Sequence, residues 1–163
     1  MKMTEQLIAA INEQINKELY SAYLYRSMAM DTADRALDGV TKWLTLQSRE
    51  EMGHAEAMIS YLEGRGVRPE LKPIAEVPNS FGTLREILTQ SLRHEQSITK
   101  SIEEIVKMAT EDHDYGVRIF FEKFVVEQEE EEESAQHNLD RLALIGDCDG
   151  AIAIFDKEMG MRE

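Results

Sequence analysis

The sequence predicts an all-α protein, a four-helix bundle with a long connection between its second and third helices and a short fifth helix at the C-terminus. Long segments repeat apolar residues every three or four positions, which is the period of an amphipathic helix. The few prolines and glycines, three and nine, cluster between these segments. A chain of 163 residues can bury one sizeable core, so we expect a single domain over residues 1–163.

The first helix is predicted from Thr4, which can act as its N-cap, to about Ala36. Glu18 lies in the middle of its apolar stripe, and Tyr25 lies on the same face two turns later. A glutamate on such a stripe is commonly paired with a basic neighbour, and a tyrosine there is commonly a hydrogen-bonded core residue. The apolar members of the stripe are Ile8, Ile11, Ile15, Ala22 and Ala29.

The second helix is predicted from Asp38, a plausible N-cap, to about Glu63, where glycines end it. Glu51 and His54 are three residues apart, so a carboxylate and an imidazole can converge on one point of the helix surface. Their face is otherwise mostly apolar, and a buried carboxylate is costly unless a cation or hydrogen bonds compensate it. The pair is therefore either half of a two-metal site or a salt-bridged, partly exposed pair.

A connection of roughly 18 residues follows, containing all three prolines and ending near Gly82. The second helix would be about 39 Å long, and the connection can span about 60 Å when extended. A loop this long needs a topological reason. A crossover along the bundle supplies one, because it lets the second and third helices run parallel.

The third helix is predicted to open at Thr83 with a T-x-x-E capping box and to continue to about Ala109. Glu95 lies on its apolar stripe and is the strongest single candidate for a buried carboxylate in the chain. The neighbouring His94 is expected to point elsewhere, because consecutive helical residues are about 100° apart. The apolar residues that flank Glu95 on its face are Leu88, Ile98 and Ile102.

The fourth helix is predicted from a turn at residues 111–114 to about Ile145 and contains the acidic run 127–133. On a helical wheel Glu131 falls within the apolar arc, Glu127 and Gln128 lie near its edges, and Glu130 lies further round. We expect the remaining glutamates of the run to be solvated. The arc is defined by Val117, Phe120, Phe124, Ala135 and Leu142, and the solvated positions are Glu129, Glu132 and Glu133.

The C-terminal segment from Ala151 to Met159 is predicted to be a short fifth helix. It is too short to be stable alone, so it must dock on the bundle. The single cysteine, Cys148, precedes it in a loop and cannot form an intrachain disulfide, which fits a reducing cytoplasm.

The polar positions recur in two hairpins with the same spacing. Glu18 and Glu51 are 33 residues apart, and so are Glu95 and Gln128. A shift of 77 residues carries Glu51 and His54 onto Gln128 and Glu131. Four core-facing polar sites in register favour a metal site between the hairpins, because salt bridges do not explain the coincidence.

Carboxylates with one imidazole and no thiolate suit iron or manganese, and would also accept zinc. One metal position, near Glu18, Glu51 and His54, is expected to be well supplied with ligands. The second, near Glu51, Glu95 and Gln128 or Glu131, is expected to be weaker. Unequal sites suit iron that arrives, is oxidised and leaves. The sequence therefore indicates a dinuclear metal centre inside one subunit, and the unequal sites favour iron as its metal.

The net charge is −14, from 18 basic and 32 acidic residues, which favours cations and opposes nucleic acid or an anionic membrane as partners. The N-terminus alternates apolar and polar residues, so no signal peptide is expected there. No apolar run approaches the ~18 residues of a membrane span.

Four segments resemble the helices of bacterial non-haem ferritins: NEQINKELYSAYLY, EEMGHAEAM, LRHEQSI and VVEQEEEE. The resemblance covers nearly the whole chain and implies a ferritin-like bundle. It implies that Glu18, Glu51 and His54 bind the first iron and that Glu51 bridges to a second. The ligands completing the second position would be Glu95 and either Gln128 or Glu131. The resemblance also implies a catalytic role for Tyr25 beside the centre and a third iron site formed by Glu50, Glu127, Glu130 and Glu131.

The same resemblance implies a homo-oligomer, a hollow closed shell of about 24 subunits with the fifth helix near a symmetry axis. Such a protein is a ferroxidase: dioxygen or hydrogen peroxide oxidises paired Fe(II), and ferric mineral collects inside the shell.

Two features distinguish the chain from related families. Arg118 and Phe121 stand where animal ferritins carry acidic residues of an iron channel, so that channel is not expected. Met52 occupies the place of the haem-binding methionine of bacterioferritins, but Gln128 and Glu131 stand where those proteins have a second E-x-x-H motif. Haem is therefore not expected, and Met52 is assigned to interface packing.

Three other functions are compatible with parts of the pattern. A haem-binding bacterioferritin is one, and a di-iron oxidase or peroxidase that stores nothing is another. A single cysteine excludes the C-x-x-C module of rubrerythrin-like enzymes. The third, a metal-free helical interaction protein, is opposed by the register of the four polar sites.

Overall fold

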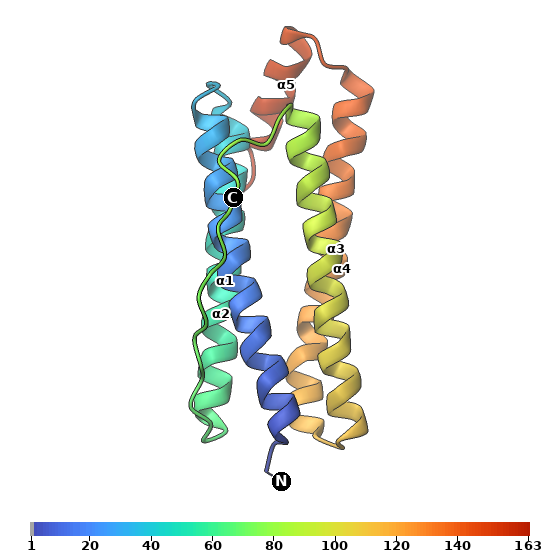
Figure 1. The fold of residues 1–163 in the computed structure, drawn as a ribbon. Coiled ribbons are helices and arrows are strands. Elements are labelled where there is room, and N and C mark those ends of the chain that lie inside the picture. The colour runs from blue at the N-terminus through green and yellow to red at the C-terminus, as the bar shows by residue number, and fades with distance from the viewer. Residues whose placement is uncertain (1) are drawn as a thin grey trace.

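The computed structural model describes residues 2–163, which form five α-helices (Figure 1). The first four helices build the bundle, and the fifth lies across its end, opposite the N-terminus. In chain order the helices are α1 (Glu5–Ala33), α2 (Asp38–Gly64), α3 (Leu84–Glu111), α4 (Tyr115–Ile145) and α5 (Asp149–Met159). Within residues 2–163, no helix is both long and apolar enough to span a membrane.

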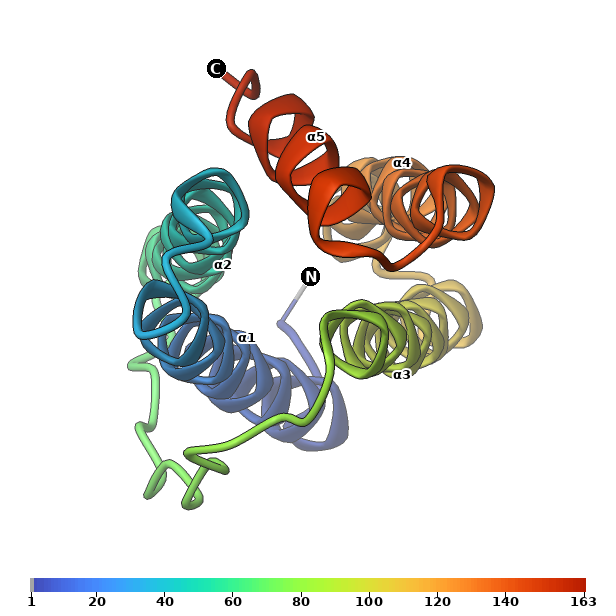
Figure 2. The same ribbon diagram turned by 90° about the horizontal axis from the view of Figure 1, so that it is seen from above.

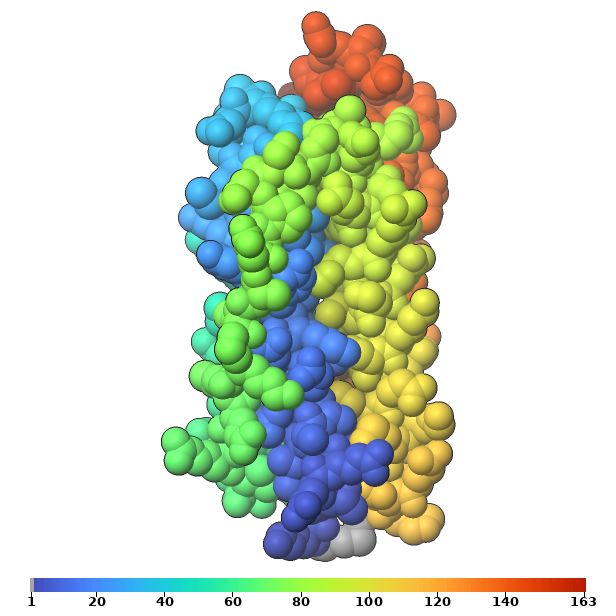
Figure 3. All heavy atoms as spheres, viewed as in Figure 1, coloured from blue at the N-terminus to red at the C-terminus, as the bar shows by residue number. Residues whose placement is uncertain are grey.

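Two hairpins make up the bundle. Helix α1 packs along α2, α3 packs along α4, and the hairpins meet mainly where α1 lies against α3 (Figure 2). The connection after α2 returns along the outside of the first hairpin, so α2 and α3 run in the same direction (Figures 1 and 3). The prediction of a crossover between parallel helices is confirmed.

Several predicted helix ends are confirmed by their caps. The Thr4 hydroxyl accepts a hydrogen bond from the backbone N–H of Leu7 at 3.3 Å. Thr83 and Glu86 form the reciprocal capping box. Asp114 caps α4 by accepting from the backbone N–H of Val117 at 3.1 Å. These caps satisfy backbone donors that a helix leaves unpaired in its first turn.

The predicted cap of α2 is wrong, because Asp38 is the first helical residue and Leu37 precedes it without a side-chain cap bond. A residue distant in sequence caps the helix instead, since Asp156 of α5 accepts from the backbone N–H of Val40 at 2.9 Å. The fifth helix, which starts two residues before its predicted position, therefore docks on the start of α2.

The apolar core consists of two clusters, one near α5 and one near the N-terminus. On each bundle helix, most of the buried polar side chains lie between the segments that supply these clusters. In this middle layer Glu18, Glu51, Glu95 and Gln128 are at most 1% exposed. The remaining buried polar residues of the layer are Gln14, Ser21, Gln47 and Ser91. The hydrophobic core thus encloses a polar layer to which all four helices contribute.

The orientation of α4 differs slightly from the helical-wheel prediction. Phe121 is fully buried, whereas Phe120 is half-buried and stacks on Tyr61. The same rotation buries Gln128 completely and leaves Glu131 half-buried, so Gln128 is the more central of the two. The prediction that Glu132 is only solvated is wrong, because its carboxylate accepts a hydrogen bond from the Thr99 hydroxyl at 2.6 Å.

A candidate dinuclear metal centre

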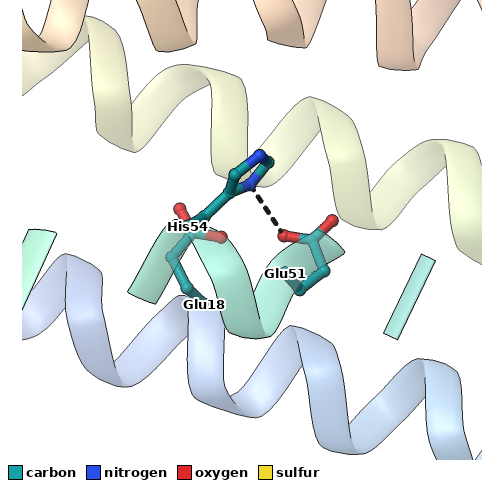
Figure 4. A group of neighbouring side chains, drawn as sticks. All are labelled: Glu18, Glu51 and His54. Carbon is teal, nitrogen blue, oxygen red and sulfur yellow. Dashed lines mark ion pairs between the residues drawn. The ribbon is translucent and has the colours of Figure 1, made fainter. Parts of the chain in front are cut away.

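The middle layer brings together Glu18 of α1 with Glu51 and His54 of α2 (Figure 4). One ligand atom from each of these side chains lies within 4.8 Å of the other two. The Glu51 carboxylate is 3.4 Å from Nδ1 of His54, and the two carboxylates face the same space. This arrangement follows from the three-residue spacing on α2 and from the close packing of α1 against α2.

Several carboxylate oxygens of this group are buried without a hydrogen-bond partner. They are both oxygens of Glu51 and Oε2 of Glu18, whereas Oε1 of Glu18 accepts from the Gln14 side chain at 2.7 Å. A buried carboxylate without a partner is strongly unfavourable in its charged form. Among the described residues, no lysine or arginine pairs with Glu18. A cation between these oxygens would satisfy them.

The electrostatics of the group lead to the same conclusion. Burial raises the pKa of Glu18 well above its ordinary value, and the nearby charge of Glu51 raises it further. Burial also raises the pKa of Glu51, with the charge of Glu95 as the next cause. Carboxyls of this kind hold protons until a metal ion displaces them. The residues present thus fit a divalent metal chemically as well as geometrically.

Glu95 of α3 is near enough for its charge to act on Glu51, and its carboxylate is held by two donors. The Tyr25 hydroxyl donates to Oε1 of Glu95, and Nε2 of Gln128 donates to Oε2 at 3.0 Å. Burial raises the pKa of Glu95, although these two hydrogen bonds oppose the rise. Burial and the Glu95 charge raise the pKa of Tyr25 well above its ordinary value, so Tyr25 remains a donor. It also contacts the Ser91 hydroxyl at 3.0 Å.

Glu131 lies at the border of the buried layer. Burial raises its pKa to about 7, with the charges of Glu95 and Glu50 as further causes. Its Oε2 accepts from Nε2 of Gln47 at 2.5 Å. Gln128, by contrast, contacts Glu95 directly. In this structure Gln128 is therefore the closer partner of Glu95, and Glu131 is held by Gln47.

Of the four residues expected at a third site, three line one cleft and the fourth contacts His54. Glu50, Glu130 and Glu131 line a cleft of about 510 Å³ between α2, α4 and α5. Glu127 lies apart from that lining, with its carboxylate 3.4 Å from Nε2 of His54. Glu50 is paired with Arg162 at 2.6 Å. Glu127 thus borders the buried centre, while the other three face the cleft.

Sequence reasoning missed several residues that hold these groups. Gln14 precedes Glu18 by four residues, and Gln47 precedes Glu51 by four, so the two glutamines are also 33 residues apart. A polar residue one turn before each glutamate, repeated at the same interval, was a signal for both. His94 does point away from the carboxylates, as expected, but its ring packs edge-on against Tyr25 and its Nε2 is 2.6 Å from the Ser21 hydroxyl.

Comparison with known proteins gives a consistent result. A family model described as Ferritin-like domain matches residues 8–145. The chain is 36% identical over 160 residues to a bacterial non-heme ferritin of Bacteroides fragilis (strain 638R), covering 98% of this chain and 99% of the relative. It is 33% identical over 155 residues to a bacterial non-heme ferritin of Campylobacter jejuni, covering 95% and 93%.

Solved structures agree over the whole chain. An open pore ferritin from the archaeon Archaeoglobus fulgidus superposes with a TM-score of 0.97 at 36% identity, covering 99% of both chains. An engineered closed form of the ferritin from the same organism superposes with a TM-score of 0.95 at 37% identity, covering 99% of this chain and 98% of that one.

Proposed function

The chain belongs to the ferritin family, and from this premise we propose that it oxidises Fe(II) at an intrasubunit dinuclear centre and stores the ferric product inside a hollow shell of its own copies. The observation that carries the proposal is the Glu51 carboxylate. Both of its oxygens are buried without a hydrogen-bond partner beside Glu18 and His54, and Glu95 of α3 is near enough for its charge to raise the pKa of Glu51. A carboxylate in that position suits a bridge between two metal ions.

In this proposal iron is the substrate. Glu18, Glu51 and His54 bind the first Fe(II), and Glu51 and Glu95 bind the second with Gln128 or Glu131. The raised pKa values of Glu18 and Glu51 mean that these carboxyls release protons as the ions bind. Each ion then gives up one electron. The electron pair and two protons convert dioxygen to hydrogen peroxide, or convert hydrogen peroxide to two water molecules.

Tyr25 supports this chemistry by position. Its hydroxyl stays protonated and donates a hydrogen bond to one oxygen of Glu95. This bond occupies one lone pair of the carboxylate and orients it, and the other lone pairs can bind iron. Gln128 holds the other oxygen in the same way. The two donors thus fix the carboxylate of the second position before iron arrives.

Storage requires a closed assembly, and the surface of the chain supports one. Large apolar side chains are exposed on α1 and α4 at helical spacing, including Tyr23 and Met30 on α1 and Ile119 and Val126 on α4. We propose that copies of the chain cover these stripes in a shell of about 24 subunits. The archaeal relative is described as an open pore ferritin, which is consistent with an enclosed space that ions enter through pores.

The proposal is tested by aerobic addition of Fe(II), followed by absorbance, desalting and measurement of the retained iron. We expect a large particle by size-exclusion chromatography and retention of far more iron than two ions per subunit. A small particle that oxidises iron but retains at most two ions would contradict storage and indicate a di-iron oxidase.

Site variants test the centre in the same assay. Glu51→Ala and His54→Ala should each slow oxidation at least tenfold, by roughly 1.4 kcal/mol or more in activation free energy, while assembly is kept. His113→Asn, in the turn between α3 and α4, is the control, because asparagine tolerates its left-handed backbone. A His54→Ala variant that oxidises iron at the parental rate would show that the site assignment is wrong.

A further inference from the structure

Arg162, which follows α5, reaches back over the bundle to the border of the candidate centre. Its Nη2 donates to Oε2 of Glu50 at 2.6 Å, and its Nη1 donates to the side-chain oxygen of Gln47. The guanidinium also lies 5.1 Å from the ring centre of Trp43. Arg162 is 115 residues from Gln47 in sequence, so only the docking of α5 on α2 brings the two together.

These contacts extend to a candidate metal ligand. A guanidinium can only donate hydrogen bonds, so the bond to Arg162 requires the oxygen of the Gln47 amide to face it. The NH₂ group of the same amide then faces Glu131 and donates to it at 2.5 Å. Gln47 is fully buried, so its amide has little freedom to turn while both bonds are made. Arg162 therefore sets the orientation of Glu131 through Gln47.

The same guanidinium places a positive charge in the acidic cleft. Glu50, Glu130 and Glu131 line this cleft together with Arg162. The charge of Arg162 lowers the pKa of Glu131, against the effect of burial. A divalent ion that leaves the buried layer toward the cleft would meet Glu50, which Arg162 contacts, and Glu131, which Arg162 orients through Gln47.

We propose that Arg162 is a positioning residue for the reaction: its side chain lies against Glu50 in place of a metal ion and, through Gln47, holds Glu131 at the border of the buried layer. A metal ion that moves to Glu50 and Glu131 must displace it, which frees the Gln47 amide and releases Glu131. The C-terminal segment would in this way restrain passage of iron from the centre to the cleft. This inference rests on the proposed function.

Trp43 provides a direct readout, because it is the only tryptophan of the chain and its ring lies against the Arg162 guanidinium. A cation over the face of an indole ring interacts with its π-system, so its departure changes the surroundings of the fluorophore. Zn²⁺ suits the titration, because it has a filled d shell and undergoes no redox change.

The experiment is calorimetric titration of the metal-free, assembled protein with Zn²⁺, with Trp43 fluorescence followed in parallel. We expect two tighter equivalents per subunit and a weaker third. In Arg162→Ala the third should bind roughly tenfold more tightly, because a competing charge has been removed from a partly buried site. The fluorescence change should accompany the third equivalent in the parent and be absent from the variant.

Arg141→Ala is the matched control. Arg141 lines the same cleft and carries the same charge, but it pairs with Glu158 and not with Glu50. We expect the affinity of this variant for the third equivalent of Zn²⁺ to stay within about twofold of the affinity of the parent. The inference would be overturned if Arg162→Ala bound the third equivalent no more tightly than the parent, or if Arg141→Ala gained as much affinity for it. It would also be overturned if none of the proteins bound a third equivalent.

The outcome also separates this inference from the function on which it rests. Glu51→Ala should lose the two tighter equivalents. If the parent has no such equivalents, or if Glu51→Ala keeps them, the dinuclear centre itself is wrong. If they are present and depend on Glu51, but the third is insensitive to Arg162, only the role of Arg162 fails.

Discussion

Glu51 shows how one residue links the stability of this protein to its chemistry. In the absence of metal, its carboxyl is buried beside Glu18 and Glu95, and burial raises its pKa from an ordinary value of 4.5. A carboxyl of this kind keeps its proton in the folded protein at pH values where the unfolded chain has lost it. Its contribution to stability is therefore complete below about pH 4.5 and is lost as the pH rises through its raised value.

We accordingly expect the metal-free protein to become less stable between about pH 5 and pH 8, the interval that also contains the pKa of about 7 for Glu131. Glu51→Gln removes an ionisation that is unfavourable in the folded state, so it should stabilise the metal-free protein at pH 8 by on the order of 1–3 kcal/mol. Thermal unfolding in the presence of a chelator, followed by circular dichroism at both pH values, measures the effect.

Glu56→Gln is the control for this prediction, because Glu56 is an exposed glutamate on the same helix. It should change stability by less than about 0.5 kcal/mol at either pH. Equal stability of the parent at the two pH values, or a Glu51→Gln variant that is less stable at pH 8, would contradict the account of the buried carboxyls.

At the scale of elements, the docking of α5 on α2 depends on a glycine. A side-chain carbon at Gly39 would lie 1.7 Å from the backbone oxygen of Asp156 and 2.9 Å from the backbone nitrogen of Gly160. The close approach of the two backbones lets Asp156 cap α2 and brings Arg162 to Glu50. A helix of 11 residues is not stable alone, so this contact determines where the C-terminus lies.

Gly39→Ala should therefore destabilise the protein by roughly 2–4 kcal/mol and displace α5, because the clash is with backbone atoms that no rotamer change can relieve. Gly53→Ala is the matched control on the same helix, since nothing lies within 4 Å of the added carbon. It should stabilise α2 by up to about 1 kcal/mol. Thermal unfolding of both variants measures the difference, and a Gly39→Ala variant as stable as Gly53→Ala would refute the docking argument.

At the scale of the whole molecule, the proposed shell requires exposed apolar side chains to become buried between copies. Ile119 on α4 is 63% exposed and shares a face with Val126, seven residues later. Among the described residues, neither side chain belongs to the two apolar core clusters. In the proposed shell, contacts between copies would bury both side chains, and each contact would be repeated in every subunit of a symmetric assembly.

Ile119→Glu should shift the protein to smaller species in size-exclusion chromatography, because a charge buried at a repeated contact is unfavourable in every subunit. Its helical content by circular dichroism should not change, since the position is exposed within the chain. Gln96→Glu, which adds the same charge at an exposed polar position of α3, should assemble as the parent does. Normal assembly of Ile119→Glu would exclude α4 from the contacts between copies.

The sequence alone determined the fold class, the order of the bundle helices and the crossover, together with the four buried polar positions of the middle layer. Helical periodicity was sufficient for this, because it states which residues share a face, and the 33-residue interval placed Glu18, Glu51, Glu95 and Gln128 at one level. The caps at Thr4 and Thr83 were also predictable, because a cap is a local interaction.

Only the tertiary structure decided which contacts form between long side chains and between segments that are distant in the sequence. The rotation of α4 about its axis determined that Gln128 is buried deeper than Glu131, and the contact with Thr99 holds Glu132, which the helical wheel predicts to be solvated. The cap of α2 by Asp156 and the reach of Arg162 depend on where α5 docks. Periodicity describes one helix at a time, whereas these contacts depend on the packing between helices, which a single sequence does not contain.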